Sequence, residues 1–160
     1  DRSRAYHHTA PISMLYGLYE ALRLVHEEGL PARFTRHQLN SDALLAGLAP
    51  LGLLPLPPQA HRLPMLNCVT LPEGIDDMLV RTQLLRDHGI EIGGGLGPLR
   101  GQVWRIGLMG ESCQQAHVLT LLNALEDIFA QHDWLDQPGR AVQAAVETYT
   151  QSQSSARRRA

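Results

Sequence analysis

The stretch that decides the fold is GIEIGGGLGPLRGQVWRIGLMG, residues 89–110. It opens with a short β-compatible run at residues 90–92, passes through a glycine-rich turn at residues 93–101, and continues as a strand-like run at residues 102–108. Apolar side chains that alternate along such a run are typical of a strand with one buried face. This stretch therefore predicts a hairpin or a pair of neighbouring strands.

The glycine cluster GGGLG, residues 93–97, lies at the centre of this stretch. Exposed backbone amides in such a cluster can bind a phosphate group. However, the glycines do not have the GxGxxG spacing, and a strand rather than the N-terminus of a helix follows them. The cluster therefore favours a plain loop whose glycines adopt positive φ or allow the backbone to approach closely.

Arg105 is the candidate binding residue of this stretch. Strand alternation places its side chain on the face opposite Trp104 and Ile106, beside Gly107, which leaves open space. An arginine can hold a carboxylate through two parallel hydrogen bonds, which a lysine cannot reproduce. A structural salt bridge is the other role open to Arg105, and the residues by themselves favour that role.

Patterns on both sides of this stretch predict further elements. The run MLNCVTL, residues 65–71, predicts another strand, and Asp76 or Asp77 can cap a helix that follows it and ends at Gly89. The strongest helical repeat of the chain lies within residues 114–132. A strand followed by a helix, twice over, indicates a small sheet covered by helices.

Two more helices are predicted near the start of the chain. Apolar residues recur at helical spacing from Pro11 to Gly29, and again after Pro31 as far as Gly52. Four of the ten prolines lie in residues 53–64, which predicts a surface connection outside regular structure.

These elements predict an α/β (α+β) chain organised around one small domain. Residues 30–136 are expected to form the small α/β domain, and residues 1–29 an interdomain segment with a long helix. Residues 137–149 are expected to form a short terminal helix. Residues 150–160 are expected to be a disordered tail, because they carry too little apolar surface to offset the entropy of ordering.

Composition excludes several classes of function. The 160 residues carry a net charge of −2 with no basic stripe in the body of the chain, which argues against nucleic acid as a partner. No apolar run is long enough to span a bilayer, and no signal peptide opens the chain, so we expect a cytoplasmic protein with no membrane partner. The chain begins at Asp1 rather than Met, and we expect it to be a piece of a longer polypeptide.

All fourteen basic residues are arginines, so the chain has no lysine. This excludes a lysine nucleophile and a lysine that binds a cofactor covalently. Cys68 and Cys113 lack the spacing of a metal site and are expected to be free thiols. His7 and His8 have no further ligand at a suitable spacing, so no metal site is predicted.

Tyr6 and Thr9 lie just before the predicted helix start at Pro11. Two hydroxyl groups near a helix N-terminus could bind an oxygen anion such as phosphate. Alternatively, Thr9 only caps the helix and Tyr6 packs against its first turn. The residues by themselves favour the second interpretation.

Two segments of the chain resemble one family of enzymes. The segment YHHTAP, residues 6–11, with the amphipathic helix after it, and the stretch at residues 89–110 resemble the C-terminal third of the class V aminotransferases. Within that family the chain is most similar to the alanine–glyoxylate and serine–pyruvate (serine–glyoxylate) type. The resemblance covers residues 4–149.

The resemblance implies a fold-type I enzyme that depends on pyridoxal 5'-phosphate and forms a homodimer with active sites at the subunit interface. On this view Tyr6 and Thr9 bind the phosphate of a cofactor held mainly by the other subunit. Arg105 binds the α-carboxylate of a small amino acid or 2-oxo acid, and the loop at residues 93–97 borders the site. The complete enzyme would move an amino group from alanine or serine to glyoxylate or pyruvate.

The family's cofactor-binding lysine lies upstream of the segment that this chain resembles. The resemblance therefore places no catalytic residue in these 160 residues, which are expected to be inactive as a transaminase by themselves. The alternative is a non-catalytic α/β dimerisation or binding module from a truncated chain.

The 160-residue chain is expected to form no covalent bond to pyridoxal phosphate through a side chain, because it has no lysine amine. Borohydride reduction in the presence of the cofactor, followed by peptide mass spectrometry, checks this expectation. Modification of the N-terminal amine is the one side reaction to set aside. A reduced cofactor attached to an internal residue would contradict the prediction.

Overall fold

The computed structural model describes residues 8–135 and 137–158. They form two compact units, which divide between Thr35 and Arg36. The sequence places this border between residues 29 and 30, whereas the structure places it several residues later, inside a helix. The helix that contains this border begins at Leu30 and ends at Leu48.

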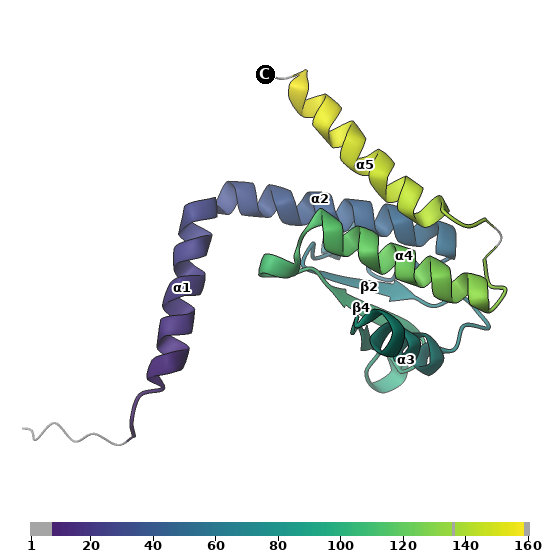
Figure 1. Ribbon diagram of the computed structural model, residues 1–160, viewed down its shortest axis with the longest axis horizontal. Helices are drawn as coiled ribbons and strands as arrows, with labels where there is room; N and C mark the ends of the chain where they lie inside the picture. The colour runs from purple at the N-terminus through teal and green to yellow at the C-terminus, as the bar shows by residue number, and fades with distance from the viewer. Residues whose placement is uncertain (1–7, 136, 159–160) are drawn as a thin grey trace, which may run out of the picture. The chain divides into compact units, whose positions relative to one another are not determined.

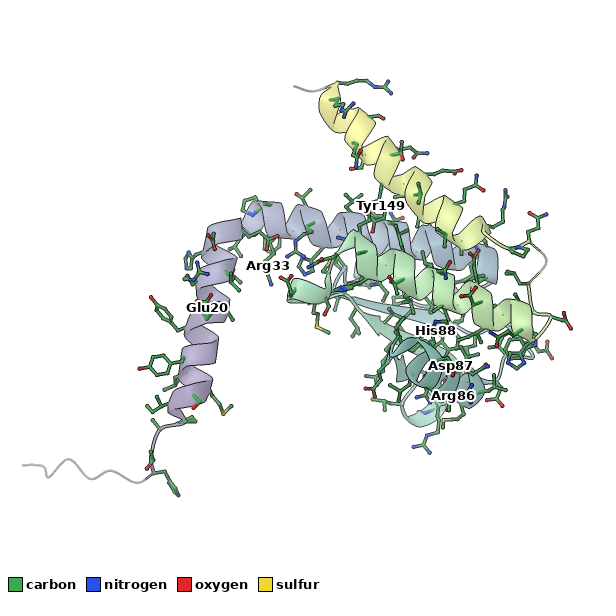
Figure 2. All side chains as sticks on the ribbon, viewed as in Figure 1. Glu20, Arg33, Arg86, Asp87, His88 and Tyr149 are labelled. Carbon is green, nitrogen blue, oxygen red and sulfur yellow. The ribbon has the colours of Figure 1, made fainter. Side chains whose placement is uncertain are left out.

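The first unit contains helix α1 (Ile12–Glu28) and the beginning of helix α2 (Leu30–Leu48). The predicted helix from Pro11 to Gly29 is confirmed, with Pro11 as the residue that precedes the first turn. Gly29 ends it with a φ of +79°, a conformation that glycine adopts without steric cost. All residues of α1 are at least partly exposed, and Figure 2 shows Glu20 on this helix, where its carboxylate lies 2.8 Å from Arg23.

The second unit contains a four-stranded antiparallel sheet in the order β1-β2-β4-β3. Its strands are β1 (Leu54–Pro55), β2 (Leu66–Thr70), β3 (Gly93–Gly94) and β4 (Val103–Gly107). The predicted strands at residues 65–71 and 102–108 are confirmed, each one residue shorter at both ends. Arg105 lies in the middle of β4, opposite Cys68 on β2 and Gly93 on β3.

Two predictions about the sheet are wrong in position. The strand expected at residues 90–92 lies instead at Gly93–Gly94, where only glycines let the backbone pass close to the side chains of Arg81 and Arg105. The connection at residues 53–64 contributes the two-residue strand β1. Its proline is tolerated because β1 is an edge strand, where a missing N–H costs no sheet hydrogen bond.

Helices α2, α3 (Asp77–His88) and α4 (Gln115–Gln131) share one hydrophobic core with the sheet. The ribbons of these helices and of strands β2 and β4 are labelled in Figure 1. Trp104 and Ile106 enter this core from β4, and Leu122 and Phe129 enter it from α4. The helical repeat predicted at residues 114–132 and the helix ending at Gly89 are both confirmed. The predicted small α/β fold is therefore confirmed.

Helix α5 (Arg140–Arg157) is longer than the short terminal helix expected at residues 137–149. The disorder expected at residues 150–160 is therefore wrong for residues 150–157. Buried Ala145 and Tyr149 hold the first half of α5 against the core. Extending a helix that has already formed fixes one residue per hydrogen bond and avoids the cost of nucleation, so a polar continuation can remain helical.

Helix α5 is held by two hydrogen bonds, one to α4 and one to α2. The buried Glu126 carboxylate of α4 accepts a hydrogen bond of 2.7 Å from the Ala141 amide, in the first turn of α5. The Tyr149 hydroxyl, labelled in Figure 2, donates to the Asn40 side chain on α2 at 2.7 Å. Burial raises the pKa of Tyr149 to about 12, so this hydroxyl stays protonated and remains a donor.

Within the described part of the chain, none of the helices combines the length and the apolar character that a membrane crossing requires.

Gly47 marks the closest approach of α2 to its neighbours. A Cβ on Gly47 would lie 2.8 Å from the carbonyl oxygen of Ala141 and would overlap Cδ1 of Leu122. The leucine side chain can rotate, but the Ala141 backbone cannot move without displacing the start of α5. The absent side chain at Gly47 therefore sets the spacing of three helices.

Gly47→Ala is expected to lower the free energy of unfolding by about 1–2 kcal/mol, because the cost of overpacking exceeds the gain in helix propensity. Chemical denaturation of the chain measures this loss. Gly17→Ala is the control, since a Cβ on Gly17 of α1 would meet nothing within 4 Å and should not reduce stability. Equal effects of the two substitutions would show that the helices are not tightly packed at Gly47.

Candidate functional site

Arg105 is held at the sheet through the first nitrogen of its guanidinium group. Nε donates a hydrogen bond of 2.9 Å to the carbonyl oxygen of Gly94 on β3. Nη2 lies 3.3 Å from the position that a Cβ on Gly93 would occupy. The half-buried side chain therefore lies toward the edge strand β3, and a side chain on Gly93 would crowd it.

The alternation predicted for β4 is confirmed, with one change. Trp104 and Ile106 are buried on the core face, and Arg105 lies on the opposite face. The open space expected beside Gly107 is partly filled, since Cε of Met109 would lie 3.0 Å from a Cβ there. The glycine that makes room for the guanidinium is Gly93 of β3 instead.

The described residues offer Arg105 no ion-pair partner. No carboxylate among them lies within 4.0 Å of its guanidinium, and its only hydrogen bond there is the one from Nε. The structural salt bridge that the residues by themselves favoured is therefore not observed. Both terminal nitrogens are left with hydrogen-bonding capacity for a further group.

A cleft of about 590 Å³ opens beside Arg105, at the β3 edge of the sheet. Arg81, Arg100 and Arg105 all line it, together with Asp76 and Asp77. Three guanidinium groups against two carboxylates leave the cleft with an excess of positive charge. Such a cleft favours a small anion with one or two carboxylate oxygens.

Asp77 and Arg81 form an ion pair in the wall of this cleft. The Nε and Nη2 atoms of Arg81 donate to the Asp77 carboxylate at 2.7 and 3.1 Å, and Nε1 of Trp104 donates to the same carboxylate at 2.8 Å. The hydrogen bond from Arg81 is the main cause that holds the pKa of Asp77 below its usual range, against the opposing effect of burial. Asp77 is therefore ionised at neutral pH.

Sequence reasoning did not find this pair. The sequence predicts only that Asp76 or Asp77 caps the helix, and Asp76 does cap α3 by accepting a hydrogen bond from the Leu79 amide at 3.0 Å. The Asp77 side chain is only 10% exposed and serves the ion pair instead. The i,i+4 spacing of Asp77 and Arg81 was the available signal.

Cys68 lies opposite Arg105 on the same face of the sheet. Burial raises the pKa of this thiol, and the positive charge of Arg105 acts in the other direction. The expectation that neither Cys68 nor Cys113 forms a disulfide is confirmed. Neither cysteine lies in a group of three or more possible metal ligands within the described residues.

Gly93 and Gly94 of the glycine cluster form the edge strand β3, and the residues after them continue as a loop, as the sequence favoured. A Cβ on Gly95 would overlap the carbonyl oxygen of Leu99, and Gly97 has a φ of +53°. The strand β4, rather than an α-helix, follows this loop along the chain. The loop borders the cleft beside Arg105 through Gly94, Gly95 and Leu96.

Tyr6 lies outside the described residues, so its predicted role in phosphate binding stays a prediction. Thr9 is exposed and precedes α1, and its hydroxyl makes no hydrogen bond within the described part of the chain. The first turn of α1 has no side-chain cap, so the capping role considered for Thr9 is not observed. Thr9 and Arg105 belong to separate compact units.

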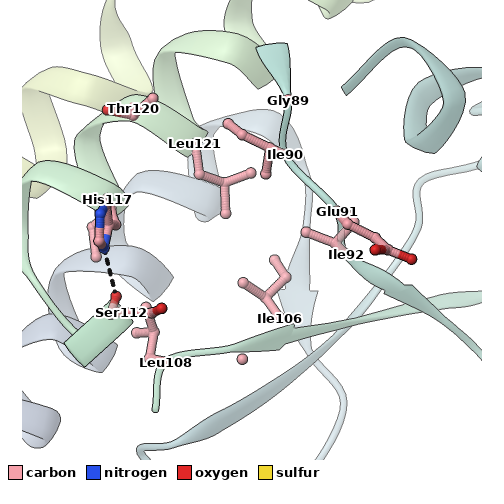
Figure 3. A pocket seen from close by; sticks show the side chains of 12 residues that line it. Gly89, Ile90, Glu91, Ile92, Ile106, Leu108, Ser112, His117, Thr120 and Leu121 are labelled. Atoms are coloured by element: carbon pink, nitrogen blue, oxygen red, sulfur yellow. Dashed lines mark hydrogen bonds between the residues drawn. The ribbon is translucent and has the colours of Figure 1, made fainter. Parts of the chain in front are cut away.

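Another hollow, of about 330 Å³, lies between the end of β4 and the start of α4. Figure 3 shows Ile90, Ile106 and Leu121 around it, with His117 at one side. Nδ1 of His117 lies 3.0 Å from the carbonyl oxygen of Ser112 and donates to it. This hollow is largely apolar and has no arginine in its wall, so the cleft beside Arg105 is the stronger candidate for binding an anion.

Comparisons with known proteins connect this geometry to one group of enzymes. The chain is 44% identical over 146 residues to the (S)-ureidoglycine–glyoxylate transaminase of Bacillus subtilis, a match that covers 91% of this chain and 35% of that protein. It is 41% identical over 125 residues to the alanine–glyoxylate aminotransferase of Drosophila melanogaster, covering 78% of this chain and 32% of that protein. No protein-family model matches the chain.

The solved structures that match this chain are also aminotransferases. The crystal structure of the ureidoglycine–glyoxylate aminotransferase from Bacillus subtilis matches 94% of this chain and 39% of its own, with a TM-score of 0.87 and 43% identity. The alanine–glyoxylate aminotransferase from a Nostoc species matches 81% of this chain and 34% of its own, with a TM-score of 0.76 and 46% identity. The chain thus spans about a third of the length of the curated relatives it matches.

Proposed function

Because this chain is homologous to class V pyridoxal-phosphate-dependent aminotransferases over about a third of their length, we propose that it is part of an aminotransferase that uses glyoxylate as amino acceptor. The observation that carries the proposal is Arg105, which reaches a positively charged cleft with both terminal nitrogens unpaired among the described residues. The Bacillus subtilis and Drosophila melanogaster relatives are both named as aminotransferases that act with glyoxylate.

Arg105 has the geometry for the part of the reaction that this chain would perform. Its Nε is already bound to the Gly94 carbonyl, so the two terminal nitrogens remain to hold the α-carboxylate. An amino acid and a 2-oxo acid present the same carboxylate, so one guanidinium can orient both substrates in turn. Gly93 keeps the space on the β3 side of the guanidinium free of a side chain.

The chain offers a hydroxyl group that can bind the phosphate of pyridoxal phosphate, but it has no lysine to bind the cofactor covalently. The Thr9 hydroxyl, with no partner among the described residues, would donate to the cofactor phosphate together with Tyr6. When bound, the cofactor stabilises the negative charge that develops at the α-carbon during amino transfer. A lysine for its covalent attachment must come from outside these 160 residues.

We propose that the complete protein is a cytoplasmic homodimer, with Tyr6 and Thr9 contributing to the active site of the partner subunit. The resemblance to the class V enzymes supports this assembly. The alternative of a non-catalytic dimerisation or binding module predicts no amino transfer by the full-length protein.

Two classes of amino donor are candidates. Alanine or serine is the donor that the resemblance implies, and the Drosophila relative supports alanine. The greater coverage of the Bacillus relative favours (S)-ureidoglycine as a second candidate. Glycine formation from glyoxylate, measured with each donor in turn on the full-length protein, distinguishes the two classes.

In the full-length protein, Arg105→Ala is expected to reduce kcat/KM for glyoxylate. The loss should correspond to about 2–5 kcal/mol of transition-state binding energy, because the carboxylate would enter the cleft without its partner. Arg105→Lys keeps the charge but loses the two-point contact, so its loss should be smaller but clear. Steady-state kinetics with the amino donor and with glyoxylate should show a loss for both.

An amine without an α-carboxylate is the control substrate, and its turnover should change much less in both variants. An equal loss for this amine would contradict the binding role of Arg105. A variant that unfolds easily but keeps normal kinetics in its folded fraction would show that Arg105 is structural.

A further inference from the structure

The wall of the cleft behind Arg105 is built from a connected set of polar contacts. Trp104 and Arg81 both donate to the Asp77 carboxylate, which ties the first turns of α3 to the sheet. The indole that does this comes from the residue next to Arg105, on the opposite face of β4. The ion pair is therefore anchored to the same strand that carries Arg105.

Gly94 connects this ion pair to Arg105. A Cβ on Gly94 would lie 3.2 Å from Cζ and Nη2 of Arg81 and 3.3 Å from its Nε, so the flat guanidinium group covers the place where a side chain would be. The carbonyl oxygen of the same Gly94 accepts the hydrogen bond from Nε of Arg105. The Arg81 guanidinium thus lies over the side-chain position of the same residue whose carbonyl oxygen is hydrogen-bonded to Arg105.

The edge strand needs such support. β3 has only two residues, both glycine, and it pairs with a single neighbouring strand. Glycine loses more backbone entropy on ordering than any other residue, so a two-glycine edge is weakly held by itself. The Arg81 guanidinium fills the space beside Gly94, into which the edge strand would otherwise be free to move, and the Asp77 carboxylate fixes this guanidinium with two hydrogen bonds.

We propose that Asp77 and Arg81 are positioning residues for carboxylate binding: they fix the Gly94 carbonyl, which orients Arg105 and leaves its two terminal nitrogens directed at the substrate. This inference rests on the proposed function, since it assigns these residues a role in the same site. Nε and Nη2 of Arg81 are bonded to Asp77, so the role assigned to Arg81 is to hold the edge strand and not to bind the carboxylate.

A purely structural role for the pair makes a different prediction. An i,i+4 ion pair at the start of a helix stabilises that helix by a few tenths of a kcal/mol. Its loss would then lower stability slightly and would affect all substrates alike. A positioning role instead raises KM for substrates that carry the α-carboxylate and spares an amine that lacks it.

The test compares four variants of the full-length protein. Arg81→Met keeps the length of the side chain and removes the guanidinium, and Asp77→Asn keeps a hydrogen-bond acceptor for Trp104 but loses the charge. Gly94→Ala puts a Cβ against Arg81 without removing either partner. Arg86→Met is the matched control, because Arg86 lies on the same helix and pairs with Asp87 on the exposed surface, as labelled in Figure 2.

The first three variants are expected to raise KM for glyoxylate and for the amino donor by about tenfold, since small displacements of a positioning group weaken binding. The value of kcat for the amine without an α-carboxylate should stay within about twofold, and Arg86→Met should match the parent protein. Arg81→Lys should recover little of the loss, because an ammonium group cannot make the same two contacts with Asp77.

Arg105→Ala separates this inference from the proposed function. If Arg105→Ala raises KM for glyoxylate but Arg81→Met and Gly94→Ala do not, the positioning role is wrong and the proposed function stands. If Arg105→Ala itself leaves KM unchanged, the proposed function fails. If Arg81→Met does not fold, Gly94→Ala and Asp77→Asn decide the question, and unchanged KM values in both overturn the inference.

Discussion

The site depends on one hydrogen bond, from Nε of Arg105 to the carbonyl oxygen of Gly94. It joins a side chain on the central strand β4 to the backbone of the edge strand β3, and it uses the one guanidinium nitrogen that a two-point contact with a carboxylate does not need. An arginine on an exposed sheet face would otherwise sample many rotamers. Binding its first nitrogen to the backbone removes much of that freedom before any ligand arrives, which lowers the entropic cost of binding.

The rest of the second unit can be understood as support for this bond. Trp104 and Ile106 bury one face of β4 in the core, so Arg105 must point to the other face. The helices behind the sheet are closely packed at Gly47, and α5 is held by the buried Glu126 carboxylate. A rigid core behind β4 gives the guanidinium a fixed base, while the glycine-only strand beside it leaves room for a ligand.

Sequence reasoning predicted the parts of this site that depend on local patterns. The alternation along β4 placed Arg105 on its correct face, and the resemblance to the class V aminotransferases agrees with the relatives at 44% and 41% identity. Sequence reasoning placed β3 at residues 90–92, too early in the chain, because glycines carry no side-chain pattern that marks a strand. It missed the role of Asp77, since the indole that binds this carboxylate lies 27 residues away along the chain. Contacts of that kind depend on the fold, and neither composition nor spacing reveals them.

A crystal structure of the full-length protein with a non-reactive carboxylate analogue of the substrate tests the central claim most directly. The account predicts that the carboxylate lies within hydrogen-bond distance of both terminal nitrogens of Arg105, while Nε stays bound to the Gly94 carbonyl. A carboxylate held by other residues would contradict it. So would an Arg105 whose terminal nitrogens pair with a carboxylate of the protein itself.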